Sequence, residues 1–198
     1  MSVLETPRLL LRPVMMADFP DMHRLHTDPL VVRSIWCGAV PSEDDTRAKM
    51  ELYLAEWRRH GFGFFSVFLK PRRYDTATFA GRGGLRYFRG TADIEYGLCL
   101  FGHMSGQGIA PELGAAVLSF AFTTLQLERV VGLIRPENIR SFRALSKNGF
   151  RHVENRQYPD GVKGFYEVRR ESFEMMHHPS VCITMEESRS PLGRTAAR

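Results

Sequence analysis

The chain has 198 residues, of which 43% are hydrophobic and 25% are charged, values typical of one soluble globular domain. Lysine and arginine exceed aspartate and glutamate by 27 − 22 = 5, a mild basic excess that would attract anions. No apolar run approaches the roughly 18 residues that a membrane helix needs, and no basic patch is interleaved with aromatic residues. Neither a membrane nor a nucleic acid is therefore expected as a partner.

The cysteines and histidines predict neither a disulfide framework nor a metal site. Cys37, Cys99 and Cys182 are odd in number and widely spaced, and the seven histidines show no metal-ligand spacing. Charged residues interrupt the apolar patch near the amino terminus, which argues against a secretory signal. We therefore expect a cytoplasmic protein that binds no metal.

The first half of the chain predicts two helices and four strands. Ser42 is a candidate N-cap for the second helix, and Gly61 is a residue type that ends helices. The run after Gly61 is rich in Phe and Val, which favours a strand. The expected elements are a strand over 8–12, a helix over 18–26, a helix from Ser42 to 60, and strands over 62–70, 78–88 and 93–100.

The second half predicts two more helices, three strands and a tail. Asn138 can cap the second of these helices, with Phe142 and Leu145 facing inward. The expected elements are a helix over 111–125, a strand over 129–135, a helix from Asn138 to Gly149, and strands over 150–158 and 163–173. Residues 1–177 are expected to form the domain and residues 178–198 a polar tail, with a short edge strand at 181–185 as the alternative.

This order of elements predicts an α/β protein. Neighbouring strands joined by tight turns alternate with single helical crossovers, which favours a mixed, mostly antiparallel sheet with helices on its faces.

The most informative motif is a glycine-bracketed loop that opens into a helix, Ser105-Gly-Gln-Gly-Ile-Ala110. It follows the strand-like run 93–100. Backbone N–H groups in such a loop, together with the positive end of a helix dipole, can hold phosphate. The alternative is that Gly106 and Gly108 merely make the connection flexible.

A second segment supports the phosphate interpretation: Pro136-Glu-Asn-Ile-Arg-Ser141, followed by Lys147-Asn-Gly-Phe150. Together with Glu95-Tyr-Gly-Leu-Cys-Leu100 and the glycine loop, it resembles the GNAT superfamily of acyl-CoA-dependent N-acetyltransferases. The branch that includes the ribosomal-protein alanine acetyltransferases is the most similar. The resemblance spans about residues 4–175. It implies a sheet of about seven strands whose two central parallel strands splay apart to admit acetyl-CoA.

The resemblance also implies which residues hold acetyl-CoA. Backbone groups of Leu98 and Leu100 would pair with the pantetheine arm, although these residues could equally be strand core. Pro111 departs from the family pattern because it lacks an N–H, and Ser105 departs from the larger residues usual there. The pyrophosphate would be held by Ser105, Gly106, Gln107, Gly108, Ile109 and Ala110.

The chemistry requires a base, because an amino group near its usual pKa of ~8 is mostly protonated at neutral pH. Glu95 is the candidate, with an ion-pair partner as the alternative interpretation. Many family members carry a Tyr where this chain has Leu145, so Ser141 is the candidate donor to the leaving thiolate, or simply a helix-start Ser. Asn138 is an N-cap or a cofactor contact, and Lys147 either meets CoA or lies in solvent.

Three functions are consistent with this pattern. The first is an acetyltransferase that acts on a protein amino terminus, as a monomer or homodimer. The second keeps the cofactor and acetylates a small amine. The third is a CoA-binding regulatory module without turnover. Trp36, Tyr53 and Trp57 either shape the acceptor pocket or belong to the core.

Overall fold

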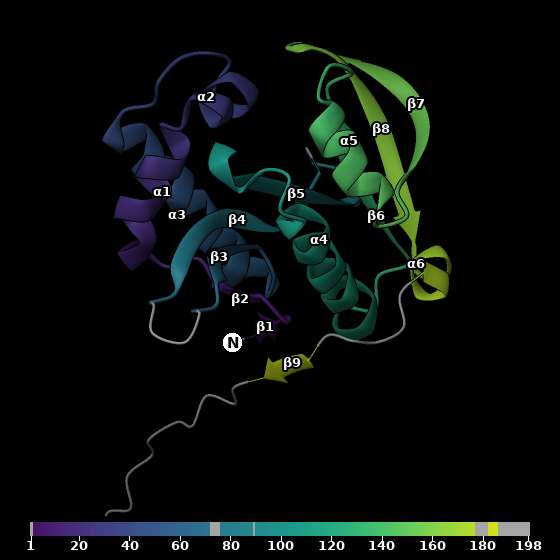
Figure 1. Cartoon of the computed structure of the whole chain (residues 1–198). Coiled ribbons are helices and arrows are strands. Elements are labelled where there is room, and N and C mark those ends of the chain that lie inside the picture. Colours follow the sequence, from purple (N-terminus) through teal and green to yellow (C-terminus); the bar gives the residue numbers. More distant parts are fainter. Residues whose placement is uncertain (1, 72–75, 89, 177–181, 186–198) are drawn as a thin grey trace, which may run out of the picture.

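The computed structural model describes residues 2–71, 76–88 and 90–176, together with the backbone of 182–185. Its centre is a nine-stranded sheet with the order β7-β8-β6-β5-β4-β3-β2-β1-β9 (Figure 1). All neighbouring strands are antiparallel except β5 and β6. The strands are β1 Ser2–Glu5, β2 Leu9–Pro13, β3 Phe64–Leu69, β4 Thr78–Tyr87, β5 Ile94–Leu100, β6 Arg129–Ile134, β7 Arg151–Tyr158, β8 Gly161–Arg169 and β9 Cys182–Met185.

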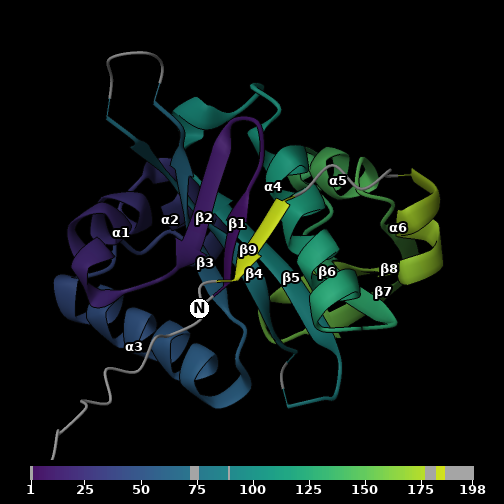
Figure 2. The same ribbon diagram turned by 90° about the horizontal axis from the view of Figure 1, so that it is seen from below.

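Helices cover both faces of this sheet (Figure 2). Arg82 and Gly83 are neighbours in β4 and therefore face opposite sides. Arg82 lies over the ring of Tyr53 from α3, whereas Gly83 faces Leu113 from α4. The helices are α1 Phe19–His26, α2 Pro29–Ile35, α3 Glu43–His60, α4 Ile109–Ser119, α5 Ile139–Ser146 and α6 Arg170–Met176, with 3-10 turns η1 Met16–Asp18 and η2 Gly102–Met104 and a π-helical turn η3 Phe120–Thr124.

The mixed α/β architecture confirms the predicted fold class. Local sequence sets several of its boundaries, most clearly in α3. The Ser42 hydroxyl accepts a hydrogen bond from the Asp45 N–H at 3.1 Å, and the Asp45 carboxylate accepts one from the Ser42 N–H at 2.8 Å. This capping box begins the helix where it was predicted. Gly61 ends it with a φ of 72°.

The sheet has two strands that the sequence analysis did not count among its seven, β1 and β9. β9 pairs with β1 from Ser2↔Met185 to Glu5↔Cys182. Within the segment expected as a tail, residues 182–185 therefore form the alternative edge strand. Residues 177–181 and 186–198 lie outside the described part of the chain. The pairing joins opposite ends of the chain, a contact that no local pattern encodes.

Two predictions in the last third of the chain were wrong. Phe142 does not face inward: its side chain is 46% exposed and lies against the ring of Tyr166 in β8. Leu145 alone takes the inward position, because it fills the space over Gly132 in β6. The final strand also ends at Arg169 instead of residue 173, since the chain turns into α6.

Two helices also differ from expectation. α4 starts at Ile109, two residues before Pro111, and its last turn widens into the π-helical η3. α2 was not predicted at all. It is a seven-residue helix whose N-terminus is capped by Asp28, which accepts from the Leu30 N–H at 2.9 Å. Pro29 lies in the first turn of this helix, where proline is common, so the sequence did contain a signal for the start of α2.

The core lies on both faces of β3. Phe64 contacts Tyr53 of α3 with ring centroids 4.9 Å apart, and Phe65 contacts Phe120 of η3 at 5.8 Å. Both phenylalanines are almost completely buried. Because neighbouring side chains of β3 point to opposite faces of the sheet, this strand packs against the helices on both sides.

His26 is a buried polar residue within the α1–α3 layer. Its Nδ1 lies 3.2 Å from the Thr46 hydroxyl of α3, and its ring meets Trp36 edge-on. Burial, and then the charges of Arg82 and Lys49, lower the pKa of His26 to about 3. The side chain is therefore neutral at physiological pH.

We predict that Gly84→Ala destabilises the fold. Gly84 pairs with Phe64, and a Cβ there would overlap the carbonyl oxygen of Gly63. The free energy of unfolding should fall by about 3 kcal/mol in urea denaturation. The matched control is Gly97→Ala on the neighbouring strand, whose Cβ would meet only the Phe64 ring at 3.4 Å. Equal losses in the two variants would contradict this interpretation.

We also predict that His26 makes the protein sensitive to mild acid. Its folded pKa of about 3 lies below the unfolded value of 6.5, so the unfolded state binds more protons between these values. Its stabilising contribution is complete above pH 6.5 and is lost as the pH falls toward 3, by up to about 1.4 kcal/mol per pH unit. In His26→Gln, the free energy of unfolding, measured with urea between about pH 7.5 and about pH 5, should fall less steeply with pH than in the wild type. His152→Gln, at an exposed position, is the control, and an unchanged slope in His26→Gln would refute the prediction.

Candidate active site

The central feature of the site is the place where β5 and β6 separate. These strands share one register pair, Glu95 with Val131, although β5 continues to Leu100 and β6 to Ile134. On its other side β5 is paired with β4 along its whole length. The backbone of residues 96–100 therefore has an edge toward β6 without a strand partner in the described part of the chain. Such an edge can pair with an extended ligand that carries amides.

Leu98 and Leu100 occupy this stretch of β5. Both side chains are half-buried and pack against the main core. Their side chains thus belong to the core, while the strand edge beside them is open. A role in the core and backbone pairing with a pantetheine arm are therefore compatible.

The glycine loop follows directly, and it exposes its backbone. Gly106 and Gly108 have φ values of 80° and 75°, a region that favours glycine. Residues 105–108 are exposed, and Gly108 is the N-cap of α4. Among the described residues, the N–H groups of 106–110 donate no loop hydrogen bond. Pro111 is the third residue of α4, so the missing N–H falls in the first turn, as expected.

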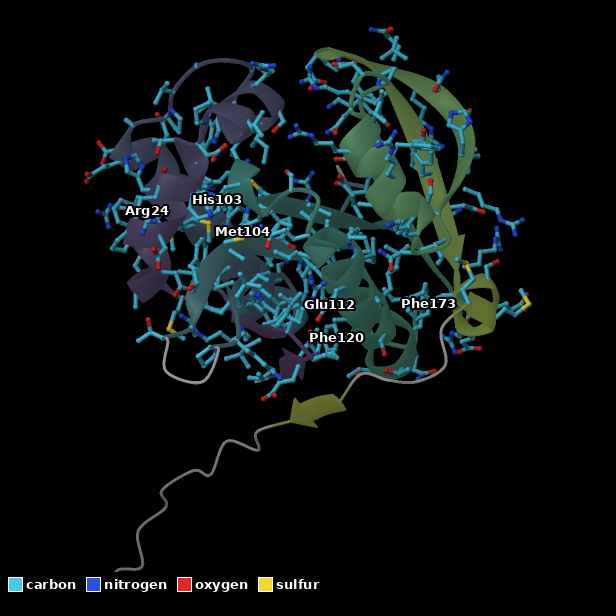
Figure 3. All side chains as sticks on the ribbon, viewed as in Figure 1. Arg24, His103, Met104, Glu112, Phe120 and Phe173 are labelled. Carbon is cyan, nitrogen blue, oxygen red and sulfur yellow. The ribbon has the colours of Figure 1, made fainter. Side chains whose placement is uncertain are left out.

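Arg8 and Glu112 fix the position of this loop, which the sequence analysis did not anticipate. The Arg8 guanidinium donates to the Glu112 carboxylate at 2.6 Å and to the Gln107 carbonyl oxygen at 2.7 Å. Thr6 donates to the other Glu112 oxygen. Burial alone would raise the pKa of Glu112, but the hydrogen bonds from Thr6 and Arg8 lower it. Figure 3 labels Glu112 at the start of α4.

Arg8 also lies at the mouth of the loop, with its charge paired with that of Glu112. Its side chain is 49% exposed, and a Cβ placed on Gly108 would lie 3.3 Å from its Nη2 atom. The guanidinium is therefore beside the free N–H groups, where an anion would meet both. Because Arg8 and the loop are about a hundred residues apart, only an alignment or a structure could associate them.

Glu95 lies where β5 and β6 begin to separate, and its two carboxylate oxygens are in different environments. Oε2 accepts from Arg86 Nε and Nη2, both at 2.8 Å. Oε1 accepts no hydrogen bond from the described residues and is not among the atoms sealed from solvent without a partner. The ion pair that the sequence analysis named as the alternative is therefore present, but it leaves one oxygen of the carboxylate available.

Three candidates lie on or beside α5. The Asn138 side chain accepts from the Ser141 N–H at 3.1 Å, so it is the N-cap of the helix. The Ser141 hydroxyl has no hydrogen-bond partner among the described residues and is half-buried. Lys147 is exposed at the end of the helix.

Cys99 does not have the properties of a nucleophile. It is 5% exposed, and burial raises the pKa of its thiol to about 11. Across the described ranges, no group of three or more His, Cys, Asp or Glu side chains could hold a metal ion. Within the same ranges, no helix is long and apolar enough to cross a membrane.

The tertiary structure brings the candidates from β5 and α4 to one sheet edge. α5 packs beside them, because Asn148 lies against Gly114 of α4 and Phe150 stacks on Tyr96 of β5 with ring centroids 6.2 Å apart. An open strand edge, a loop of free N–H groups and a half-buried hydroxyl are thus neighbours. This set can bind an extended ligand that has amides at one end and phosphates at the other.

Comparison with known proteins agrees with this geometry. Residues 8–151 match the family model "Acetyltransferase (GNAT) domain". An uncharacterized N-acetyltransferase, YnaD of Bacillus subtilis (strain 168), is 26% identical over 148 residues, which cover 75% of this chain and 82% of YnaD.

Solved structures show the same fold. The ribosomal alpha-N-protein acetyltransferase RimL in complex with coenzyme A superposes with a TM-score of 0.73 at 17% identity, covering 86% of this chain and 99% of RimL. The aminoglycoside acetyltransferase AAC(6')-Ib in complex with coenzyme A gives 0.68 at 19% identity, covering 84% and 98%. Because the family model matches more than half of the sequence, the chain belongs to the GNAT acetyltransferase family and is an acyl-CoA-dependent N-acetyltransferase.

Proposed function

We propose that the protein transfers an acetyl group from acetyl-CoA to a primary amine by direct attack. The observation that carries the proposal is the open edge of β5 beside the loop at residues 105–110. Leu98 and Leu100 would pair with the pantetheine amides through their backbones. The free N–H groups of the loop, with Arg8, would hold the pyrophosphate. Asn138 and Lys147 remain candidate contacts for CoA.

In this proposal Glu95 prepares the amine. Its Oε1 atom, directly or through water, takes a proton from the ammonium group, and the neutral nitrogen attacks the thioester carbon. The C–N bond forms as the C–S bond breaks, the electron pair leaves on sulfur, and the second proton lost by the nitrogen passes to the thiolate. Arg86 holds the other carboxylate oxygen and fixes its direction. Ser141 donates a hydrogen bond to the departing thiolate, since its hydroxyl has no other partner among the described residues.

The acceptor class has two alternatives. RimL is named for a ribosomal protein and AAC(6')-Ib for aminoglycosides, so proteins with this fold acetylate both kinds of acceptor. We propose an amine acceptor in the cytoplasm, a protein amino terminus or a small amine, for a monomer or homodimer. Thiol release from acetyl-CoA over a panel of peptide amino termini and small amines separates the two acceptor classes.

We predict that Gly108→Val weakens acetyl-CoA binding at least about tenfold in isothermal titration. A branched side chain is strained at a φ of 75° and crowds the position beside Arg8 where phosphate would approach. The control is Gly61→Val, which has nearly the same φ of 72° at the end of α3 and open space around it. Unchanged affinity in a folded Gly108→Val protein would place the phosphates elsewhere.

We predict that Glu95→Gln lowers kcat by about 10²–10⁴-fold and leaves CoA affinity nearly intact. Removing the carboxylate also frees Arg86, so a second variant is needed to separate the two effects. Arg86→Gln breaks the ion pair but keeps the carboxylate, and it should retain much more activity, with a displaced pH profile of kcat. Equal losses in the two variants would mean that the ion pair positions the strand and that Glu95 is not the base.

A further inference from the structure

The turn between β1 and β2, at residues 6–8, supports the glycine loop through its backbone as well as its side chains. The Thr6 hydroxyl and the Arg8 N–H, the latter at 3.0 Å, donate to the same oxygen of Glu112. The Arg8 guanidinium donates to the other Glu112 oxygen and to the Gln107 carbonyl oxygen. Because two of these donors move with the backbone of the turn, the start of α4 is held only as firmly as the turn itself.

The turn is closed locally and is anchored on the side of β3. The Thr6 N–H donates to the Leu9 carbonyl oxygen at 3.0 Å, and the Leu9 N–H donates to the Thr6 hydroxyl at 2.9 Å. Lys70, which follows β3, donates from Nζ to the Thr6 carbonyl oxygen at 2.7 Å and from its N–H to the Arg8 carbonyl oxygen at 2.8 Å. On its other side the turn continues directly into β1.

The strand β1 is paired with β9 along its whole length. Within the described part of the chain, β1 pairs with β2 only at Leu4 and Glu5, whereas all four of its residues pair with β9. Figure 2 shows β9 alongside β1. For Ser2 and Val3, β9 is the only strand partner among the described residues. Without β9, β1 would be a four-residue edge strand with half of its residues unpaired, which is a marginal arrangement.

Glu112 makes the position of the turn important for the electrostatics of the loop. Its carboxylate lies in the first turn of α4, beside the N–H groups that would receive the pyrophosphate. Arg8 pairs with this carboxylate at 2.6 Å and so neutralises its charge. If the turn moved away, the unpaired carboxylate would repel phosphate groups at the same loop, because like charges at close range disfavour each other.

We infer that β9 supports acetyl-CoA binding from a distance: its pairing with β1 holds the turn at residues 6–8, and the turn holds the loop at residues 105–110. The residues of β9 are therefore positioning residues that do not touch the ligand. This rests on the proposed function, in which the loop receives the pyrophosphate. Because Lys70 also anchors the turn, loss of β9 should weaken acetyl-CoA binding without abolishing it.

The first test compares two truncated chains. Removing residues 177–198 deletes β9, whereas removing residues 186–198 keeps it. The chain that ends at Met176 should bind acetyl-CoA about five- to tenfold more weakly in isothermal titration. Its KM for acetyl-CoA should rise while kcat at saturation changes little. The chain that ends at Met185 should match the full-length protein, and equal affinities in the two truncated chains would overturn the inference.

A double-mutant cycle separates positioning from a general loss of stability. Glu112→Ala removes the carboxylate that receives the hydrogen bonds from Thr6 and Arg8. In this background, deletion of residues 177–198 should change the Kd for acetyl-CoA far less than it does in the wild type, because both changes interrupt the same series of contacts. Independent, additive losses would mean that β9 acts only on overall stability, and the inference would be wrong.

The intact protein provides a second measurement that does not require the truncated chain to fold. Coupling between two sites is reciprocal, so acetyl-CoA should stabilise the pairing of β9 with β1 by the factor by which β9 raises acetyl-CoA affinity. Hydrogen exchange of the amides in β9 should therefore slow by about five- to tenfold when acetyl-CoA is added. The control is β7, at the opposite edge of the sheet, where exchange should not change.

Unchanged exchange in β9, or equal slowing at both edges of the sheet, would overturn the inference and leave the acetyltransferase intact. A full-length protein that does not bind acetyl-CoA would instead refute the proposed function.

Discussion

The geometry of the site depends on the separation of two parallel strands after one shared residue pair. Strands β5 and β6 meet at Glu95 and Val131 and then diverge, so the middle of the sheet contains an edge. Elsewhere an edge is a liability, because its N–H and C=O groups remain free to pair with another chain. Here the free edge lies in the middle of the sheet, on the side of β5 that faces β6.

Contacts from Arg8 hold the start of α4 in place. The loop that would receive phosphate contains two glycines with φ in the left-handed region. Arg8, from the opposite end of the domain, ties its backbone and its first helical turn to β2. Binding then costs less conformational entropy, because the N–H groups are already in place.

The other face of β5 has a different electrostatic character. There one guanidinium, Arg86, is neutralised by Glu95, while a second, Arg82, has aromatic rings but no anion. The faces of the Tyr53 and Phe64 rings offset part of the cost of burying that charge.

The sequence by itself determined the features that depend on neighbouring residues. The capping box of Ser42 and Asp45, the stop at Gly61, the strand–loop–helix order around Gly108 and the Asn138 cap all follow from local backbone chemistry. Spaced motifs then indicated the family and, through it, the sheet and its cofactor. Only the tertiary structure decided the rest. The contact of Arg8 with Glu112, the pairing of β9 with β1 and the packing of Phe142 on Tyr166 each join residues far apart in the chain. Such contacts depend on which surfaces meet in three dimensions, and the local periodicity of a single sequence does not encode that.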